Sequence, residues 1–172
     1  HTFGEENVGL YQLVFPVYAL GISFSCAGTE LALSRCVAQE NAAGHPEKAK
    51  ELLKTGLIFT FVLSCILTIF LQHNAHMTAI SFLHDSRCEE LLILLSYTFP
   101  FASIHSCICG YSLGLKQTKI PAVSQLFEQT FRILFVFLFC YYRTSHQLDL
   151  SISFAVVGLA MGEIFASCYC LY

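Results

Sequence analysis

The sequence contains few charged residues for its length. Asp, Glu, Lys and Arg make up 12% of the 172 residues, whereas about 25% is usual in a soluble domain. Hydrophobic residues make up 55% of the chain, and its mean hydropathy is +0.62. Because one soluble core of this size could not bury so much apolar surface, the composition excludes an ordinary soluble domain and predicts a membrane protein.

The sequence also lacks a basic cluster and the motifs of common enzymes. Its net charge is −3 and its Lys and Arg residues are scattered, so we expect no nucleic-acid partner. His-Glu-x-x-His and a phosphate-binding glycine loop do not occur in it. We therefore expect no enzymatic activity and no cofactor. The chain begins at His1 without a recognisable signal peptide, which indicates a fragment or a processed chain, organised as a single transmembrane domain over residues 1–172.

The cysteines are numerous, but their positions argue against disulfides and against a metal site. Most of the nine lie in apolar runs, where cysteine behaves as a small hydrophobic residue. Cys107 and Cys109 are two residues apart, so they point to nearly opposite sides of a helix, and the same holds for Cys168 and Cys170. Neither pair can bind one metal ion by itself. The loop histidines are expected to be solvated rather than metal-bound: His73, His76 and His84.

Five apolar segments are long enough to cross a bilayer, which takes about 20 residues. The segments between them are short and polar, and none resembles a soluble domain. The expected fold is therefore an all-α, polytopic transmembrane helix bundle. The predicted spans cover residues 8–33, 52–71, 91–113, 120–142 and 150–172.

The basic residues between the spans predict how the chain is oriented in the membrane, since cytoplasmic loops are enriched in Lys and Arg. The second and fourth connections hold only Arg87 and Arg143. We therefore expect the first and third connections in the cytoplasm, the N-terminus outside and the C-terminus inside. An odd number of spans that starts outside also predicts a preceding helix. The cytoplasmic assignment depends on six residues: Arg35, Lys48, Lys50, Lys54, Lys116 and Lys119.

Charged residues inside the predicted spans are the main candidates for function. A charge near the bilayer centre costs several kcal/mol unless it faces a partner or a cavity. At about 1.5 Å per residue, Glu128 and Arg132 lie about 12 and 18 Å into the fourth span, near the middle of a core about 30 Å thick. Their i,i+4 spacing places them on one helix face together with Gln125 and Gln129, and Glu163 lies deep in the fifth span.

Two interpretations of this polar stripe stay open. The Glu128–Arg132 pair could neutralise itself and brace the bundle. Alternatively, the pair could line a cavity for an anionic or sugar-bearing substrate or for a coupling ion, with Gln125, Gln129 and Glu163 in support.

Two pairs of glycines predict close helix packing. Gly110 and Gly114 are four residues apart in the third span, as are Gly158 and Gly162 in the fifth. This spacing places both members of a pair on one helix face, where a neighbouring backbone can approach. A sliding contact within a transporter is the alternative to simple packing.

The sequence CGYSLGLKQTKIPAVSQLFEQTFRI, from Cys109 to Ile133, resembles a known family. Its pattern of Gly-Tyr-x-x-Gly, a short basic loop, Pro and Ser-Gln-x-x-Glu-Gln-x-x-Arg is similar to that of the stage V sporulation protein B and polysaccharide-export group. This group belongs to the multidrug/oligosaccharidyl-lipid/polysaccharide flippase superfamily. Residues 9–40 resemble the second helix of the group, and Gly162-Glu163 also fits.

The resemblance implies that the chain holds helices 2–6 of a larger transporter, a part of the N-terminal lobe of two lobes around a central cavity. Such proteins flip lipid-linked oligosaccharides, polysaccharides or peptidoglycan precursors by alternating access, in cell-wall synthesis or sporulation. The implied partners are membrane lipids, the lipid-linked saccharide and the remainder of the same chain, and the coupling ion would be H⁺ or Na⁺. The first span has no arginine, unlike in the related lipid II flippases, which favours the sporulation and polysaccharide branch. The alternatives are a multidrug and toxin extrusion antiporter and a membrane scaffold that recruits wall-synthesis enzymes without transport.

Overall fold

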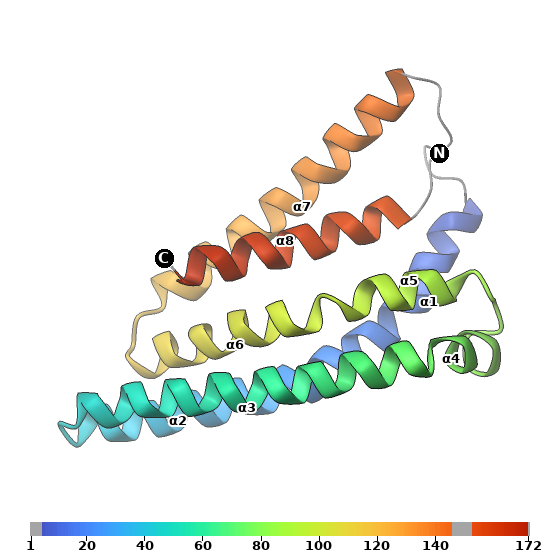
Figure 1. Cartoon of the computed structure of the whole chain (residues 1–172). Coiled ribbons are helices and arrows are strands. Elements are labelled where there is room, and N and C mark those ends of the chain that lie inside the picture. The colour runs from blue at the N-terminus through green and yellow to red at the C-terminus, as the bar shows by residue number, and fades with distance from the viewer. Residues whose placement is uncertain (1–4, 146–152, 172) are drawn as a thin grey trace.

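The computed structural model describes residues 5–145 and 153–171 of the chain. These residues form a bundle of helices and contain no β-strand (Figure 1), which confirms the all-α prediction. The first residues of the predicted fifth span, 150–152, lie outside the described part. The elements are α1 (Glu5–Ile22), the π-helix η1 (Ser23–Ala27), α2 (Gly28–Ala42), α3 (Pro46–His73), α4 (Ala75–Ser81), α5 (Cys88–Ser96), α6 (Phe99–Gly114), α7 (Lys119–Ser145) and α8 (Ser153–Leu171).

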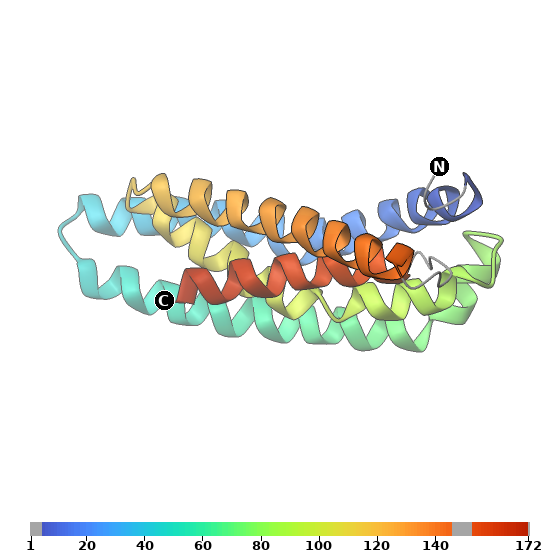
Figure 2. The same ribbon diagram turned by 90° about the horizontal axis from the view of Figure 1, so that it is seen from above.

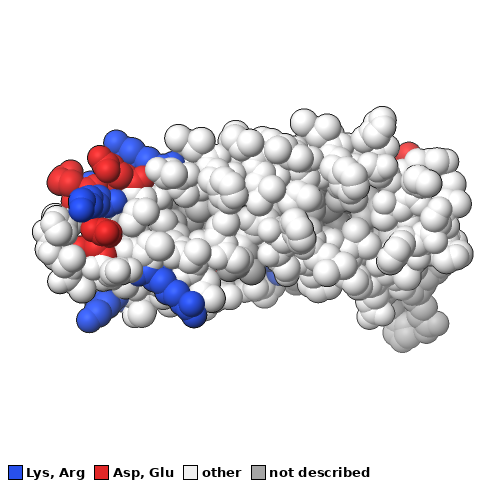
Figure 3. Space-filling view, turned by 90° about the horizontal axis from the view of Figure 1, so that it is seen from below, with Lys and Arg blue, Asp and Glu red and all other residues white. Residues whose placement is uncertain are grey.

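The long helices run along the length of the bundle (Figures 1 and 2). The α2–α3 and α6–α7 connections lie together at one end, and α4 lies at the other end. Charged side chains gather at the end where α2 meets α3, whereas the long middle of the face in Figure 3 is almost without charge. This surface therefore suits an apolar environment. Large exposed hydrophobic side chains on α3 include Ile58, Phe59, Val62, Ile66 and Ile69.

Two described helical stretches are long and apolar enough to cross a membrane, namely Gln12–Ala42 and Pro46–His73. The bent pair α5–α6 makes a third if it counts as one span, and α8 contributes a shorter apolar stretch, Val156–Cys170. Within the part of the chain that the structure describes, helix α7 is not in this set although it has 27 residues. The count of five spans therefore stays a prediction.

The third predicted span is broken into α5 and α6, whose axes differ by 42°. The break falls at Tyr97 and Thr98, immediately before a Pro in the first turn of α6. That residue, Pro100, has no backbone N–H and cannot extend the hydrogen-bond ladder of the preceding helix. Its fixed φ is nevertheless suited to a helix start, so the chain bends and resumes as α6.

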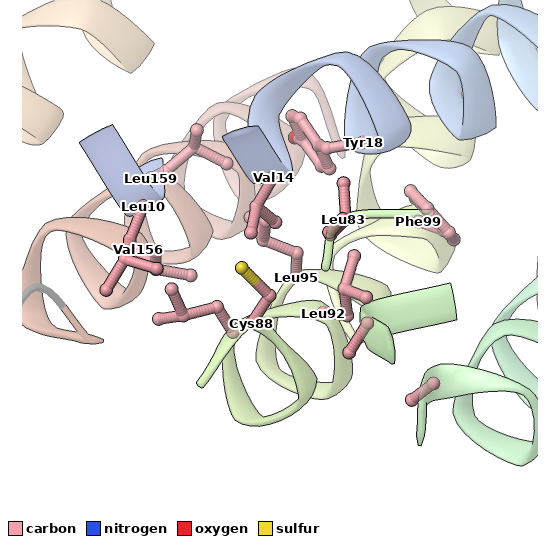
Figure 4. Packing of buried hydrophobic residues seen from close by; sticks show 13 residues of the cluster. Leu10, Val14, Tyr18, Leu83, Cys88, Leu92, Leu95, Phe99, Val156 and Leu159 are labelled. Atoms are coloured by element: carbon pink, nitrogen blue, oxygen red, sulfur yellow. The ribbon is translucent and has the colours of Figure 1, made fainter. Parts of the chain in front are cut away.

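An apolar core joins α1 to α5 and α8 (Figure 4). Tyr18 of α1 stacks on Phe99 at the start of α6, with ring centroids 6.0 Å apart. The close packing fixes the position of α1 against the helices that carry the site described below. The labelled members of this core are Leu10, Val14, Tyr18, Leu83, Cys88, Leu92, Leu95, Phe99, Val156 and Leu159.

Helix α6 lies directly on the backbone of α2 through two glycines. A Cβ atom on Gly110 would come 2.7 Å from the Glu30 carbonyl oxygen, and one on Gly114 would come 2.7 Å from the Ser34 carbonyl oxygen. Both distances are too short for any larger residue. The spacing of four therefore brings two helix backbones together along one line.

Helices α7 and α8 approach each other at the second glycine pair. A Cβ atom on Gly162 would lie 3.0 Å from the Glu128 carbonyl oxygen, and one on Gly158 would lie 2.9 Å from Val136 Cγ2. Because Gly162 directly precedes Glu163, this close approach also brings the Glu163 carboxylate toward α7.

Buried hydroxyl and thiol groups link α3 to α6. The Thr60 Oγ1 atom lies 3.0 Å from Cys107 Sγ, and Ser64 Oγ lies 3.2 Å from Ser103 Oγ. Small polar side chains of this kind are a common means of joining helices in apolar surroundings. With the glycine contacts, they hold α6 between α2 and α3.

Candidate functional site

A cavity of about 370 Å³ lies among η1, α2, α6, α7 and α8. Helix η1 is a π-helix of five residues, Ser23–Ala27, and its Ser23 and Cys26 line the cavity. π-helical turns interrupt α-helices rarely, and often at functional sites. Most lining residues carry polar side chains: Ser23, Cys26, Glu30, His105, Ser106, Cys109, Gln125, Glu128 and Glu163.

The polar stripe of α7 is divided between the cavity and its border. Gln125 and Glu128 line the cavity, and Glu128 is 9% exposed. Arg132 donates a hydrogen bond to the Glu128 carboxylate and a second one, of 3.4 Å, to Gln129 Oε1. Neither Gln129 nor Arg132 is among the lining residues. The arrangement thus combines the two interpretations, because Arg132 neutralises a carboxylate that itself faces the cavity.

Glu163 of α8 completes the acidic part of the cavity. Its carboxylate, that of Glu128 and the imidazole of His105 each offer an atom within 4.8 Å of the other two. His105 Nδ1 lies 3.7 Å from Glu163 Oε2. The sequence suggests no meeting of two carboxylates apart from Glu128 with Glu163, and the structure brings these two together. Two carboxylates so close repel each other electrostatically.

His105 and Glu30 line the cavity but are absent from the sequence candidates. His105 Nε2 lies 3.0 Å from the Ser124 hydroxyl of α7. Ser106 of α6 donates a 2.9 Å hydrogen bond to Glu30 Oε2, and its hydroxyl also lies 3.4 Å from the Cys26 carbonyl oxygen. In the sequence, each of these two residues, His105 and Glu30, is an isolated ionisable residue within an apolar segment. Position along the segment alone does not distinguish a residue that lines a cavity from one that lies near the helix end.

Cysteines of α6 and α8 meet beside this cluster. Cys109, Cys170 and His105 each offer a ligand atom within 4.8 Å of the other two. The sequence argument compared cysteines within each i,i+2 pair, where the two side chains do diverge. One member of each pair, Cys109 of α6 and Cys170 of α8, nevertheless points to the same place between the two helices.

The loop at the far end of the bundle holds charge pairs outside the apolar region. His76 Nδ1 lies 2.8 Å from Glu89 Oε2, so this histidine has a partner rather than being solvated alone. Arg87 donates backbone and side-chain hydrogen bonds to Asp85. These bonds lower the pKa of the Asp85 carboxyl below its usual value.

The cavity is acidic in charge. Glu30, Glu128 and Glu163 line it, and no Lys or Arg is among the lining residues that the structure describes. Arg132 pairs with Glu128 from outside the lining. In surroundings of low dielectric constant such a charge pattern attracts cations and hydroxyl donors and disfavours anions.

An α-helical bundle with an apolar outer surface and a polar cavity between its helices is typical of a membrane protein. Residues 2–172 match the family described as "Polysaccharide biosynthesis protein", and the chain belongs to that family. No solved structure matches the chain.

Three relatives come from Bacillus subtilis (strain 168). Stage V sporulation protein B is 32% identical over 161 residues, which cover 94% of this chain and 30% of the relative. Lipid II flippase MurJ is 27% identical over 77% of this chain and 26% of its own length. Sporulation protein YkvU is 20% identical over 96% of this chain and 36% of its own length. The chain thus spans about a third of the length of these relatives, or less.

Proposed function

We propose that the whole protein is a flippase, not an enzyme, and that it moves a lipid-linked oligosaccharide, polysaccharide or peptidoglycan precursor across the cell membrane. The described helices would form most of one lobe, with the remainder of the same chain and membrane lipids as their partners. The family and the similarity to stage V sporulation protein B and to a lipid II flippase support this class. The observation that carries the proposal for these residues is the polar cavity among η1, α2, α6, α7 and α8.

The chemistry of the cavity suits the saccharide part of such a substrate. Carboxylates accept hydrogen bonds from sugar hydroxyls, and the Gln125 amide both donates and accepts. The volume of about 370 Å³ lies within the range of small-ligand sites. A pyrophosphate group would be repelled by Glu30, Glu128 and Glu163, so its cationic partners would have to come from elsewhere in the whole protein.

Alternating access is the mechanism that fits this packing. At Gly110, Gly114 and Gly162, the α2–α6 and α7–α8 contacts are made to the backbone of the neighbouring helix. Because no large side chains interdigitate at these glycines, the helices can shift past one another there. Glu128 and Glu163 would then hold the coupling ion, H⁺ or Na⁺, in one of the two states.

The proposed topology is multi-pass, with the N-terminus of this segment outside and its C-terminus in the cytoplasm. In support of it, the α2–α3 and α6–α7 connections, in or near which the six basic residues lie, are at one end of the bundle (Figure 2). Accessibility labelling of single cysteines placed in each connection tests this topology.

Transport by full-length variants in proteoliposomes tests the proposal. Glu128→Gln and Glu163→Gln keep the shape of the side chain but remove a charged acceptor, which is worth about 1.5–3 kcal/mol. Movement of a fluorescent lipid-linked saccharide should therefore slow about tenfold or more, whereas Glu47→Gln, at an exposed position on α3, should transport normally. Normal transport by the Glu128/Glu163 double variant would refute the role of the cavity. Extrusion of cationic drugs instead of saccharide would favour an antiporter, and wall synthesis that persists without any transport would favour a scaffold.

A further inference from the structure

We propose that α6 and α8 form a binding site for a divalent cation of the Zn²⁺ type, with His105, Cys109 and Cys170 as its protein ligands. The imidazole and the two sulfur atoms lie within 4.8 Å of one another. One imidazole and two thiolates are a donor set that zinc prefers. This inference concerns metal binding and does not depend on the flippase proposal.

The distances fit a site that closes on the ion. Zinc bonds of about 2.0–2.3 Å in a tetrahedron place neighbouring ligand atoms about 3.4–3.8 Å apart. The three ligand atoms lie within 4.8 Å of one another. They therefore have to approach by about 1 Å to bind one zinc ion, which small changes in the side-chain torsion angles allow. His105 and Cys109 also line the cavity, so water or a further ligand can reach the fourth position.

The two nitrogen atoms of His105 have different surroundings. Its Nε2 atom lies 3.0 Å from Ser124 Oγ, and the same oxygen lies 3.7 Å from Cys109 Sγ. Its Nδ1 atom lies 3.7 Å from Glu163 Oε2. A histidine that binds zinc through one nitrogen usually donates its other N–H to a carboxylate, which is the part Glu163 can take.

An independent observation at Glu163 supports the same assignment. This residue is 8% exposed, and its Oε2 atom accepts no hydrogen bond from the described part of the chain. A buried carboxylate oxygen without a donor is costly. When zinc holds His105 with its proton on Nδ1, that oxygen gains a donor.

Charge favours the sulfur triad over the neighbouring carboxylate triad of His105, Glu128 and Glu163. Arg132 already donates to Glu128, so a divalent ion at that carboxylate would be repelled by a fixed positive charge about twice as strongly as a coupling ion of charge +1. Zn²⁺ with the thiolates of Cys109 and Cys170 is neutral as a unit, which suits apolar surroundings. The nearby carboxylates add a negative potential that draws a cation toward the site.

Zinc titration of the full-length protein tests the proposal. The protein, purified in detergent and reduced, is stripped with a chelator and titrated with Zn²⁺ against a chromophoric competitor. Cys168→Ser is the matched control for Cys170→Ser, because Cys168 is on the same helix but exposed. We expect one tight equivalent in the wild type and in Cys168→Ser, and binding more than about 100-fold weaker in Cys170→Ser, since loss of an outer carboxylate alone typically costs 10–100-fold.

Two further measurements separate the possible results. Co²⁺ bound in place of zinc should give thiolate charge-transfer absorption, and Glu163→Gln should weaken Zn²⁺ binding about 10–100-fold with that absorption retained. Equal binding by Cys170→Ser and Cys168→Ser would overturn the proposal, as would a site abolished by Glu128→Gln alone. If Cys170→Ser does not fold, maleimide labelling of the wild type decides: Zn²⁺ should protect Cys109 and Cys170, and absence of protection overturns the assignment.

Discussion

The contact between α6 and α2 gives a direct prediction of stability. Replacement of Gly110 by Ala adds one Cβ atom at 2.7 Å from the Glu30 carbonyl oxygen and 3.2 Å from Glu30 Cα. Both neighbours are backbone atoms of a helix, so the added methyl group cannot be accommodated by a side-chain rotation. The two helices must move apart by several tenths of an ångström along their contact.

The expected cost follows from two opposing terms. Overpacking of a tight contact costs about 1–3 kcal/mol. In an unobstructed helix, Gly→Ala stabilises by about 0.8–1 kcal/mol. Gly28 is the matched control, because it begins α2 and a Cβ there meets nothing within 4 Å. Both variants gain the propensity term, so Gly110→Ala should be less stable than Gly28→Ala by the overpacking term alone, about 1–3 kcal/mol.

Thermal unfolding of the full-length variants in detergent, followed by far-ultraviolet circular dichroism, measures this difference. Gly28→Ala should unfold at or above the wild-type temperature, and Gly110→Ala should unfold clearly below Gly28→Ala. Equal unfolding temperatures for the two variants would refute the inference that backbone contact at Gly110 holds α6 on α2.

Three further predictions concern polar contacts. Ser106→Ala removes the hydrogen-bond donor to Glu30 and should lower stability by about 1.5–3 kcal/mol in urea unfolding, whereas an unchanged midpoint would exclude this contribution. Arg132→Ala in the full-length protein should abolish complementation of a strain lacking it while membrane insertion persists, and failure to accumulate would point to a structural role. Asp85 has a lowered pKa through Arg87, so its contribution to stability is present above the unfolded-state pKa and is lost as the pH falls through the folded-state pKa. The stability difference between wild type and Asp85→Asn should therefore be present at neutral pH and vanish in acid, and a difference that grows in acid would contradict this sign.

The fold class and part of the cavity follow from the sequence because they depend on local patterns. The i,i+4 spacing of Glu128 and Arg132 fixes their common face on α7, and the structure keeps them paired. Glycine spacing likewise marks the faces of α6 and α8 that approach neighbours closely. These features belong to one helix at a time.

The rest of the site depends on which faces of separate helices meet, and no single-helix pattern contains that information. Three residues of the site come from different helices: Glu30, His105 and Cys170. Their roles become visible only from their contacts with one another or with α7. The break between α5 and α6 was equally hidden, because the apolar run is continuous through Tyr97 and Thr98. The signal of Pro100 predicts a kink but not that two helices result.

The π-helix η1 has a consequence for insertions and deletions in the continuous helical stretch from α1 through η1 to α2. Each residue of a helix turns the chain by about 100°, so the wider turn at Ser23–Ala27 sets the rotational phase of α2 relative to α1. Tyr18 packs in the apolar core while Glu30 faces the cavity. Loss of a single residue from η1 would turn Glu30 away from the cavity without altering any side chain of α2. The number of residues in this turn, more than their identity, thus determines which face of α2 lines the cavity.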